Sequence, residues 1–391
     1  MKKFLSLLFA IMMLMSALVG CAPEEVKEPV VHDHNDPAAE SVEYKTQPEL
    51  IEAMGMGWNL GNTLDAPDGE NSWGQPTTTK EMMATLKELG YDSVRIPVSW
   101  GKHVSEKPEY IIDDDWMARV KEVVDYALEC DLIVVINSHH DNGIYHPRKN
   151  NGDDAVEYLS AIWTQIAEEF KDYDQNLIFE AMNEPRLDGT DHEWWLDVNC
   201  GECQYAAEIV NNCNQAFVDV VRASGGENAD RYLLASTYCG APDSAMNGLY
   251  KLPDDSAADK LMLAVHAYTP YDLAMGDNLN IKDFGSGEKG SIDWFINRLY
   301  NEYVSKGVHV VIDEMGIINK NNPLSRYEWA KYYVTKAKEN GMACMVWDNG
   351  HTDPGHESYG LFDRRNLKIF DSAESVHKGF MDAINGTNSL G

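Results

Sequence analysis

The sequence is poor in positive charge. Its 391 residues include 32 Lys and Arg against 64 Asp and Glu, which gives a formal net charge of −32. Proteins that bind nucleic acid displace counterions with clustered basic side chains, and peripheral binding to anionic lipid also depends on them. The deficit therefore excludes general affinity for nucleic acid or for an anionic membrane surface.

Cysteine is also scarce, with seven residues in the whole chain. Cys200 and Cys203 have the spacing of zinc ligands, but no second such pair and no pair of histidines lies near them in the sequence. We therefore predict neither a metal nor a cofactor. The spacing of the cysteines leaves any disulfide connectivity open.

A long apolar run occurs only at the N-terminus. Residues 1–20 begin with Lys2 and Lys3 and continue without charge to Gly20, which is typical of a signal peptide, with a membrane anchor as the alternative. Leu18-Val19-Gly20-Cys21 resembles the lipobox of bacterial lipoproteins, which implies cleavage before Cys21 and lipid on its thiol. We therefore predict an exported protein, held at the cell surface or the outer face of a membrane by this lipid alone.

The segment after the signal peptide has a different composition. Residues 22–45 contain seven acids, two bases, three prolines and one aromatic residue, which is typical of a solvated linker. The sequence thus predicts a signal peptide at 1–20, a lipidated Cys21 with a flexible acidic tether at 21–45, and one catalytic domain at 46–391.

From residue 46 onward, short apolar runs alternate with amphipathic stretches. The runs predict eight strands at 55–60, 93–97, 132–138, 177–181, 232–236, 261–266, 308–312 and 343–347, and the stretches predict helices at 79–89, 116–128, 158–170, 206–223, 292–306 and 326–340. Most runs are continuous, as in parallel strands buried on both faces. Because a doubly wound sheet would usually show a glycine-rich phosphate turn that the first strand lacks, we predict a single (β/α)₈ TIM barrel.

Polar residues collect where the predicted strands end, which is where barrels place their active sites. In strand order, these are Trp58, Asn59, Asn62, Arg95, His139, His140, Asn183, Glu184, Tyr238, His266, Tyr268, Glu314 and Trp347. Glu184 and Glu314 follow strands 4 and 7, on opposite walls of a barrel. Two such carboxylates suit glycoside hydrolysis, in which one donates a proton and the other attacks or activates water.

Several motifs resemble glycoside hydrolase family 5 in its endoglucanase and xyloglucanase branch. They are FEAMNEPR at 179–186, GWNLGNTLDA at 57–66, VRIP at 94–97, NSHHD at 137–141, VHAY at 265–268 and IDEMG at 312–316, all in the family's order and spacing. The resemblance covers residue 46 to the end. It implies that Glu184 is the general acid/base, that Glu314 is the nucleophile, and that the configuration is retained.

The same resemblance implies a substrate-binding role for other residues. They are Asn62, Arg95, His139, His140, Asn183, His266, Tyr268 and Trp347, with Trp73 expected to line a loop over the cleft. Either histidine of the 139–140 pair could face the substrate. Relatives often have glycine where this chain has Asp313, and we expect this extra acid to point outward from the barrel.

The predicted function is that of a retaining endo-β-1,4-glucanase acting on cellulose-type glucan, mixed-linkage glucan or xyloglucan. A β-mannanase of the same family and an inactive glycan-binding lipoprotein remain as alternatives, although both glutamates are present. A metal-dependent barrel hydrolase would need paired histidines after the first strand, where Trp58 and Asn59 stand. The expected partner is a polysaccharide, and the expected state is a monomer.

Overall fold

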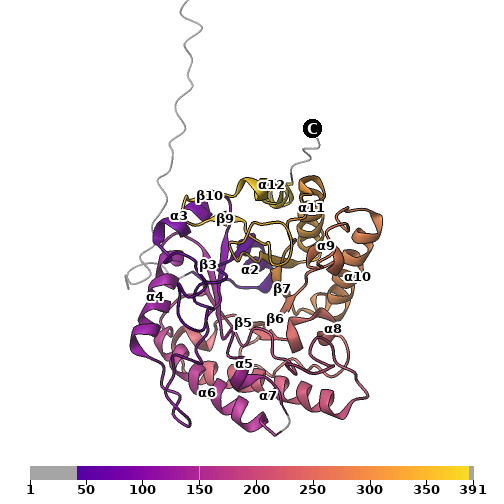
Figure 1. The fold of residues 1–391 in the computed structure, drawn as a ribbon. Helices are drawn as coiled ribbons and strands as arrows, with labels where there is room; N and C mark the ends of the chain where they lie inside the picture. The colour runs from indigo at the N-terminus through magenta and orange to yellow at the C-terminus, as the bar shows by residue number, and fades with distance from the viewer. Residues whose placement is uncertain (1–41, 149, 387–391) are drawn as a thin grey trace, which may run out of the picture. The chain divides into compact units, whose positions relative to one another are not determined.

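The computed structural model describes residues 42–148 and 150–386 (Figure 1). The predicted signal peptide, Cys21 and most of the predicted tether lie outside these residues. Within them, no helix is long and apolar enough to span a bilayer.

Eight parallel strands form a closed barrel in sequence order. Their bounds are β1 Met56–Asn59, β2 Ser93–Ile96, β3 Ile133–Asn137, β4 Leu177–Glu180, β5 Leu233–Ser236, β6 Leu261–His266, β7 Val310–Met315 and β8 Met342–Val346. Pairing of β1 with both β2 and β8 closes the ring. The predicted (β/α)₈ barrel and all eight predicted strands are confirmed.

Long helices surround the barrel (Figure 1). They are α3 Lys80–Glu88, α4 Asp114–Leu128, α6 Gly152–Glu169, α7 Gly201–Ala223, α10 Ser286–Glu302 and α11 Pro323–Glu339, which confirms the six predicted helices, and α12 Glu374–Ile384 follows β8. Shorter elements are α5 Asn142–Tyr145, α8 Pro242–Ala245, α9 Tyr271–Ala274 and the hairpin of β9 Phe362–Asp363 with β10 Lys368–Ile369.

A helix that the sequence analysis did not predict closes the N-terminal end of the barrel. In α2 Gln47–Met54, the side chains of Leu50 and Met54 are fully buried in a cluster with inward-facing residues of the strands. Gln47 donates to the carbonyl of Leu261 at 3.0 Å. Apolar burial of this kind supplies most of the stability of a short helix.

The predicted tether ends earlier than residue 45. The Val42 N–H donates to Asp174 at 3.1 Å, the Tyr44 hydroxyl donates to Asn176 at 2.8 Å, and Lys260 donates to the Tyr44 carbonyl at 2.9 Å. Residues 42–45 are therefore bound to the barrel, and the composition of the segment did not reveal these bonds.

Strand β7 is longer than predicted and irregular. It runs to Met315 instead of ending at residue 312, and its register against β8 shifts between Ile312 and Met315. Val311 packs inside the barrel, whereas Ile312 packs in the outer layer against the helices. Because a bulge interrupts the alternation of side chains, successive residues after Ile312 can turn toward the same side.

Candidate active site

The center of the site is Arg95 on β2, which is fully buried. Its Nε and Nη2 donate to the two oxygens of Glu180 at 2.6 and 2.8 Å. Its Nη1 donates to Glu314 at 2.7 Å and to the Asn59 side chain at 3.0 Å, and Nη2 also donates to Asn183 at 2.9 Å. One guanidinium on β2 thus fixes side chains from β1, β4, β7 and the segment after β4, as its planar set of donors allows.

Glu314 has a second hydrogen bond, from the Tyr268 hydroxyl at 3.0 Å. Both bonds hold the carboxylate in a fixed orientation. The structure therefore places Arg95 and Tyr268 beside Glu314, where the sequence analysis expected them.

Glu184 lies just beyond β4, and His266 ends β6. Glu184 Oε1 is 2.7 Å from His266 Nδ1, and its Oε2 accepts from Arg186 at 3.1 Å. Burial alone would lower the pKa of His266, but the charge of Glu314 and the bond to Glu184 raise it to about 9. Burial would raise the pKa of Glu184, but His266 and Arg186 lower it. These two opposite shifts describe one proton shared by the His266–Glu184 pair.

The two candidate catalytic carboxylates lie close together. One oxygen of Glu184, one nitrogen of His266 and one oxygen of Glu314 lie within 4.8 Å of one another. Their partners differ, because Glu314 is bound by Arg95 and Tyr268 whereas Glu184 is bound by His266 and Arg186. Carboxylates that share a site but differ in environment can take the separate roles of acid and nucleophile.

Asp313 does not point outward, and that prediction is wrong. Its carboxylate is fully buried, 3.8 Å from Arg95 Nε and 3.6 Å from His266 Nε2, and neither oxygen has a hydrogen-bond partner. The register of β7 explains this orientation, because Asp313 is two residues from the inward-facing Val311.

The environment of Asp313 favours its neutral form. Burial, together with the nearby charge of Glu180, raises the pKa of Asp313 well above its usual range. Arg95 already donates to Glu180 and Glu314 and makes no hydrogen bond to Asp313. An acid without a donor is the member of such a cluster that retains a proton.

Four aromatic rings line the site beside these acids. His139 lies parallel to Trp347, with ring centroids 5.9 Å apart, and meets His140 edge-on at 4.4 Å. Burial lowers the pKa of His139 well below its usual range, so its ring is neutral. His140 is half-buried and lies 5.4 Å from the Trp73 ring, which is 42% exposed. The structure thus groups these four predicted residues.

Asn62 lies apart from the acids, in the loop after β1. Its backbone is left-handed, with φ of 59°, and its N–H donates to Asp65 at 2.9 Å. Its side chain is half-buried. The structure shows no bond from this side chain to a catalytic carboxylate, so its substrate-binding role remains a prediction.

The segment between β4 and α7 forms one wall of the site. Arg186 donates to Glu184 and, through Nε, to Glu193 at 3.3 Å, and its guanidinium stacks over Trp194 with 4.7 Å to the ring centroid. The Tyr238 hydroxyl, after β5, donates to the His192 carbonyl at 2.7 Å and accepts from the Leu187 N–H. These bonds fix the loop beside Glu184.

Sequence reasoning missed several members of the site. Glu180 stands inside a continuous apolar strand pattern, and its position four residues before Glu184 was the available signal. Asn59 donates to the Asp313 carbonyl at 2.8 Å and accepts from Arg95, although it had been treated only as a strand-end residue. Pairing of Arg186 with Glu193 depends on the path of the loop, which no local pattern encodes.

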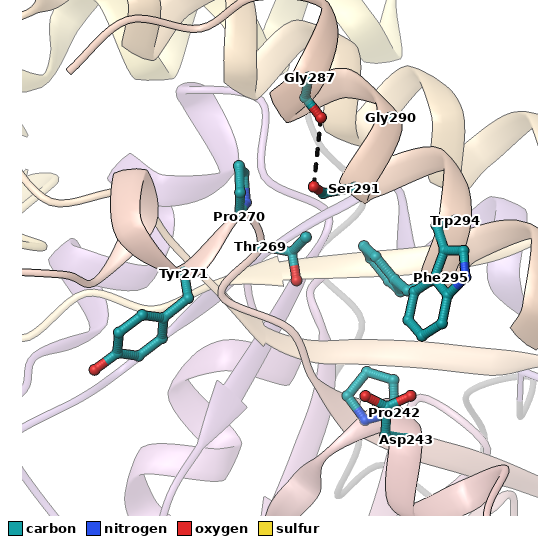
Figure 2. Close-up of a pocket in the computed structure, with 10 residues that line it drawn as sticks. All are labelled: Pro242, Asp243, Thr269, Pro270, Tyr271, Gly287, Gly290, Ser291, Trp294 and Phe295. Carbon is teal, nitrogen blue, oxygen red and sulfur yellow. Dashed lines mark hydrogen bonds between the residues drawn. The ribbon is translucent and has the colours of Figure 1, made fainter. Parts of the chain in front are cut away.

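The described part of the chain also contains a pocket away from these acids. Its volume is about 600 Å³, and it lies among α8, the segment from Thr269 to Tyr271 and α10, as Figure 2 shows. Trp294 and Phe295 line one side. None of the residues bonded to Arg95 or Glu184 lines this pocket, so it is separate from the strand-end site.

A (β/α)₈ barrel with one carboxylate beyond β4 and a second near the end of β7 has the arrangement of a glycoside hydrolase. A family model described as cellulase (glycosyl hydrolase family 5) matches residues 56–353. The chain belongs to this family.

The chain is similar to several characterised relatives. It is 39% identical over 348 residues to endoglucanase A of Clostridium longisporum, covering 85% of this chain and 65% of that protein, and 40% identical to endoglucanase A of Ruminococcus albus, covering 82% and 89%. It is 41% identical to the cellulase/esterase CelE of Acetivibrio thermocellus but spans only 39% of that protein.

Solved structures resemble it over most of its length. A family 5 lichenase mutant from a Caldicellulosiruptor species, in complex with cellotetraose, has a TM-score of 0.83 and 39% identity, covering 88% of this chain and 97% of that one. A xyloglucan-specific endo-beta-1,4-glucanase from a metagenomic library, in complex with cellotriose, has a TM-score of 0.80 and 35% identity, covering 87% and 98%.

If Asp313 is neutral in the folded protein, the free energy of unfolding of the wild type should depend on pH in a way that the Asp313→Asn variant does not show. The folded pKa is raised, so above the ordinary aspartate range the unfolded chain releases a proton that the folded chain keeps. The free energy of unfolding of the wild type should therefore fall by about 1.4 kcal/mol per pH unit relative to the variant, until the raised pKa is passed. Denaturant unfolding of both proteins across the pH range measures this.

Asp254→Asn is the matched control, because Asp254 is exposed. Its stability curve should run parallel to that of the wild type. Parallel curves for Asp313→Asn as well would show that Asp313 is ionised in the folded protein and would contradict the assignment.

Proposed function

We propose that this protein is a retaining endo-β-1,4-glucanase that hydrolyses β-glucans through a covalent glycosyl-enzyme intermediate. The observation that carries the proposal is the proximity of Glu184 and Glu314, whose oxygens lie within 4.8 Å and have different partners. Retaining enzymes have carboxyl groups about 5–5.5 Å apart, whereas inverting enzymes leave about 6.5–9.5 Å for a water molecule.

In the first step, Glu314 attacks the anomeric carbon and the glycosidic bond breaks. Arg95 and Tyr268 orient the Glu314 carboxylate for attack. The leaving oxygen takes its proton from Glu184, which draws on the proton shared with His266. In the second step, Glu184 removes a proton from water, which attacks the anomeric carbon and releases Glu314.

Other side chains hold the sugar. The Asn183 amide, fixed by Arg95, is placed to bond the 2-hydroxyl of the sugar on Glu314, and such a bond strengthens as the oxocarbenium ion forms. Trp347 and Trp73 offer apolar ring faces to pyranose rings. A glucan is neutral, so the surplus of acids on the protein does not repel it.

The names of the relatives favour β-glucan over mannan. They include endoglucanases, a lichenase and a xyloglucan-specific enzyme, some of them solved with cello-oligosaccharides. A β-mannanase is the second candidate from the sequence, and no residue of the described chain specifically favours it. The presence of both Glu184 and Glu314 argues against an inactive glycan-binding protein.

Substitution of the two glutamates separates their roles. Glu184→Gln should lower the rate on β-glucan by about 10²–10⁴-fold, because it removes proton transfer to the leaving oxygen. With an aryl glycoside whose leaving group needs no proton, the same variant should accumulate a glycosyl-enzyme that intact-protein mass spectrometry detects. Glu314→Gln should lose hydrolysis and form no adduct while still binding oligosaccharide.

Glu109→Gln, which changes an exposed acid, serves as the control and should retain the wild-type rate. If Glu314→Gln hydrolyses glucan at the wild-type rate, Glu314 is not the nucleophile. An adduct that forms equally in both glutamate variants would also contradict these roles.

A panel of soluble polysaccharides tests the substrate class. Release of reducing ends from barley β-glucan, xyloglucan and carboxymethyl-cellulose should exceed release from mannan at least about tenfold, because a site that bonds an equatorial 2-hydroxyl disfavours the axial one of mannose. A faster rate on mannan would replace the β-glucanase proposal with the β-mannanase.

We also propose that the protein is exported and anchored by lipid on Cys21. This rests on the signal-peptide pattern and on the similarity of residues 18–21 to a lipobox. In a bacterial host, the wild type should sediment with membranes, and Cys21→Ser should shift the protein to the soluble exported fraction. Equal membrane association of both proteins would indicate an uncleaved apolar anchor instead.

A further inference from the structure

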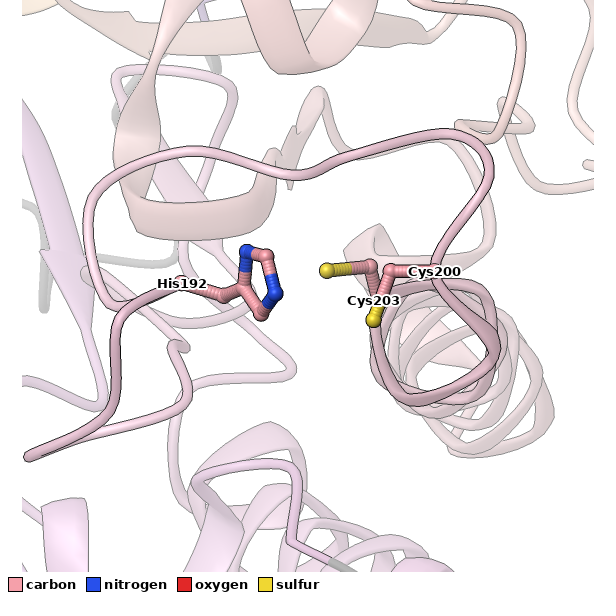
Figure 3. A group of neighbouring side chains, drawn as sticks. All are labelled: His192, Cys200 and Cys203. Carbon is pink, nitrogen blue, oxygen red and sulfur yellow. The ribbon is translucent and has the colours of Figure 1, made fainter.

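Two thiols and an imidazole meet on the wall beside the cleft, and the proposed mechanism uses none of them. His192 lies in the loop between β4 and α7, Cys200 is the residue before α7, and Cys203 lies in its first turn. One donor atom of each residue lies within 4.8 Å of the other two. Figure 3 shows the imidazole facing the cysteine side chains at the start of the helix.

Neither sulfur of this cluster is in a disulfide, although the two thiols are hydrogen-bonded to each other. Both cysteines are free thiols, and His192 Nδ1 is buried without a hydrogen-bond partner.

The chemistry of the donors selects the kind of ion. Two sulfurs and one imidazole nitrogen are soft and borderline ligands, which zinc-class ions prefer, whereas magnesium and calcium prefer oxygen. The cluster contains no carboxylate. Three protein ligands leave a fourth position of a tetrahedral site for water, and His192 and Cys200 are only half-buried, so solvent can reach it.

We propose that His192, Cys200 and Cys203 bind one thiophilic divalent cation of the zinc class, and that this ion fastens the loop between β4 and α7 to the start of α7. The sequence analysis predicted no metal because it found no second pair of ligands nearby. The third ligand stands eight residues before Cys200, and only the path of the loop brings it to the thiols.

The loop connects this site to the cleft. Glu193, next to His192, accepts from Arg186 at 3.3 Å and from the Gly189 N–H at 3.1 Å. Arg186 in turn donates to Glu184. If the proposed function holds, a bound ion therefore orders the residues that orient the general acid/base, without contacting the substrate itself.

Zinc binding to the reduced full-length protein tests the site, with titration calorimetry and thermal unfolding as readouts. We expect one tight equivalent of Zn²⁺ and a higher unfolding midpoint. Cys200→Ser, Cys203→Ser and His192→Gln should each weaken the affinity at least about tenfold, because each removes a ligand. Co²⁺ in the wild type should show a thiolate charge-transfer band that both cysteine variants lose.

Two control variants locate the ion. Cys130→Ser changes a half-buried thiol outside the cluster and should bind Zn²⁺ as the wild type does. Glu314→Gln removes a donor of the group of Glu184, His266 and Glu314 in the cleft, another place where an ion could bind, and should leave the affinity unchanged. Because these readouts do not use hydrolysis, they stand even if the proposed function fails.

Absence of tight Zn²⁺ binding by the reduced protein would overturn the proposal. Wild-type affinity in the His192→Gln variant would overturn the three-ligand site. A loss confined to Glu314→Gln would place the ion in the cleft and would overturn it as well.

Discussion

The charge on Arg95 is the constraint on which the site depends. This guanidinium is fully buried and donates to Glu180, Glu314, Asn59 and Asn183. A buried arginine is stable only when its donors are satisfied, and removal of one partner of such a network typically costs about 3–5 kcal/mol. The same bonds that stabilise Arg95 fix the positions of the proposed nucleophile and of the amide that would bond the sugar. At Arg95, the bonds that stabilise the barrel interior are therefore also the bonds that set the geometry of the proposed reaction.

The distribution of protons follows from that arrangement. Arg95 donates to Glu180 and Glu314, and His266, whose pKa is raised, pairs with Glu184, so an acid that keeps a proton is one that neither of these cations bonds. Asp313 lacks any donor and is the acid that does so. Because the neutral Asp313 carries no charge, it does not draw the Arg95 guanidinium away from its hydrogen bond to Glu314. An ionised Asp313 would have competed with Glu314 for the Arg95 guanidinium.

Much of the fold could be predicted from the sequence, because periodic apolar runs reflect burial directly. The eight strands and the residues at their ends follow from that pattern. Asp313 could not be placed, since strict alternation puts it on the opposite face from Glu314 and gives no warning of the irregular register in β7, which lets both side chains turn inward. Helix α2 was not predicted. Its apolar residues pack against the inward-facing residues at the end of the barrel and do not belong to the outer layer of helices. The cluster of His192 with Cys200 depends on a loop whose path is set by distant contacts such as Tyr238.

The central claim is that Glu184 and Glu314 act as a retaining pair oriented by Arg95. The most direct measurement is the anomeric configuration of the first product, followed by proton NMR during hydrolysis of a β-glucan before the sugars equilibrate in water. Retention predicts that the new reducing end appears first as the β-anomer and converts slowly to the α-anomer. Initial formation of the α-anomer would show single-step inversion and would contradict the account.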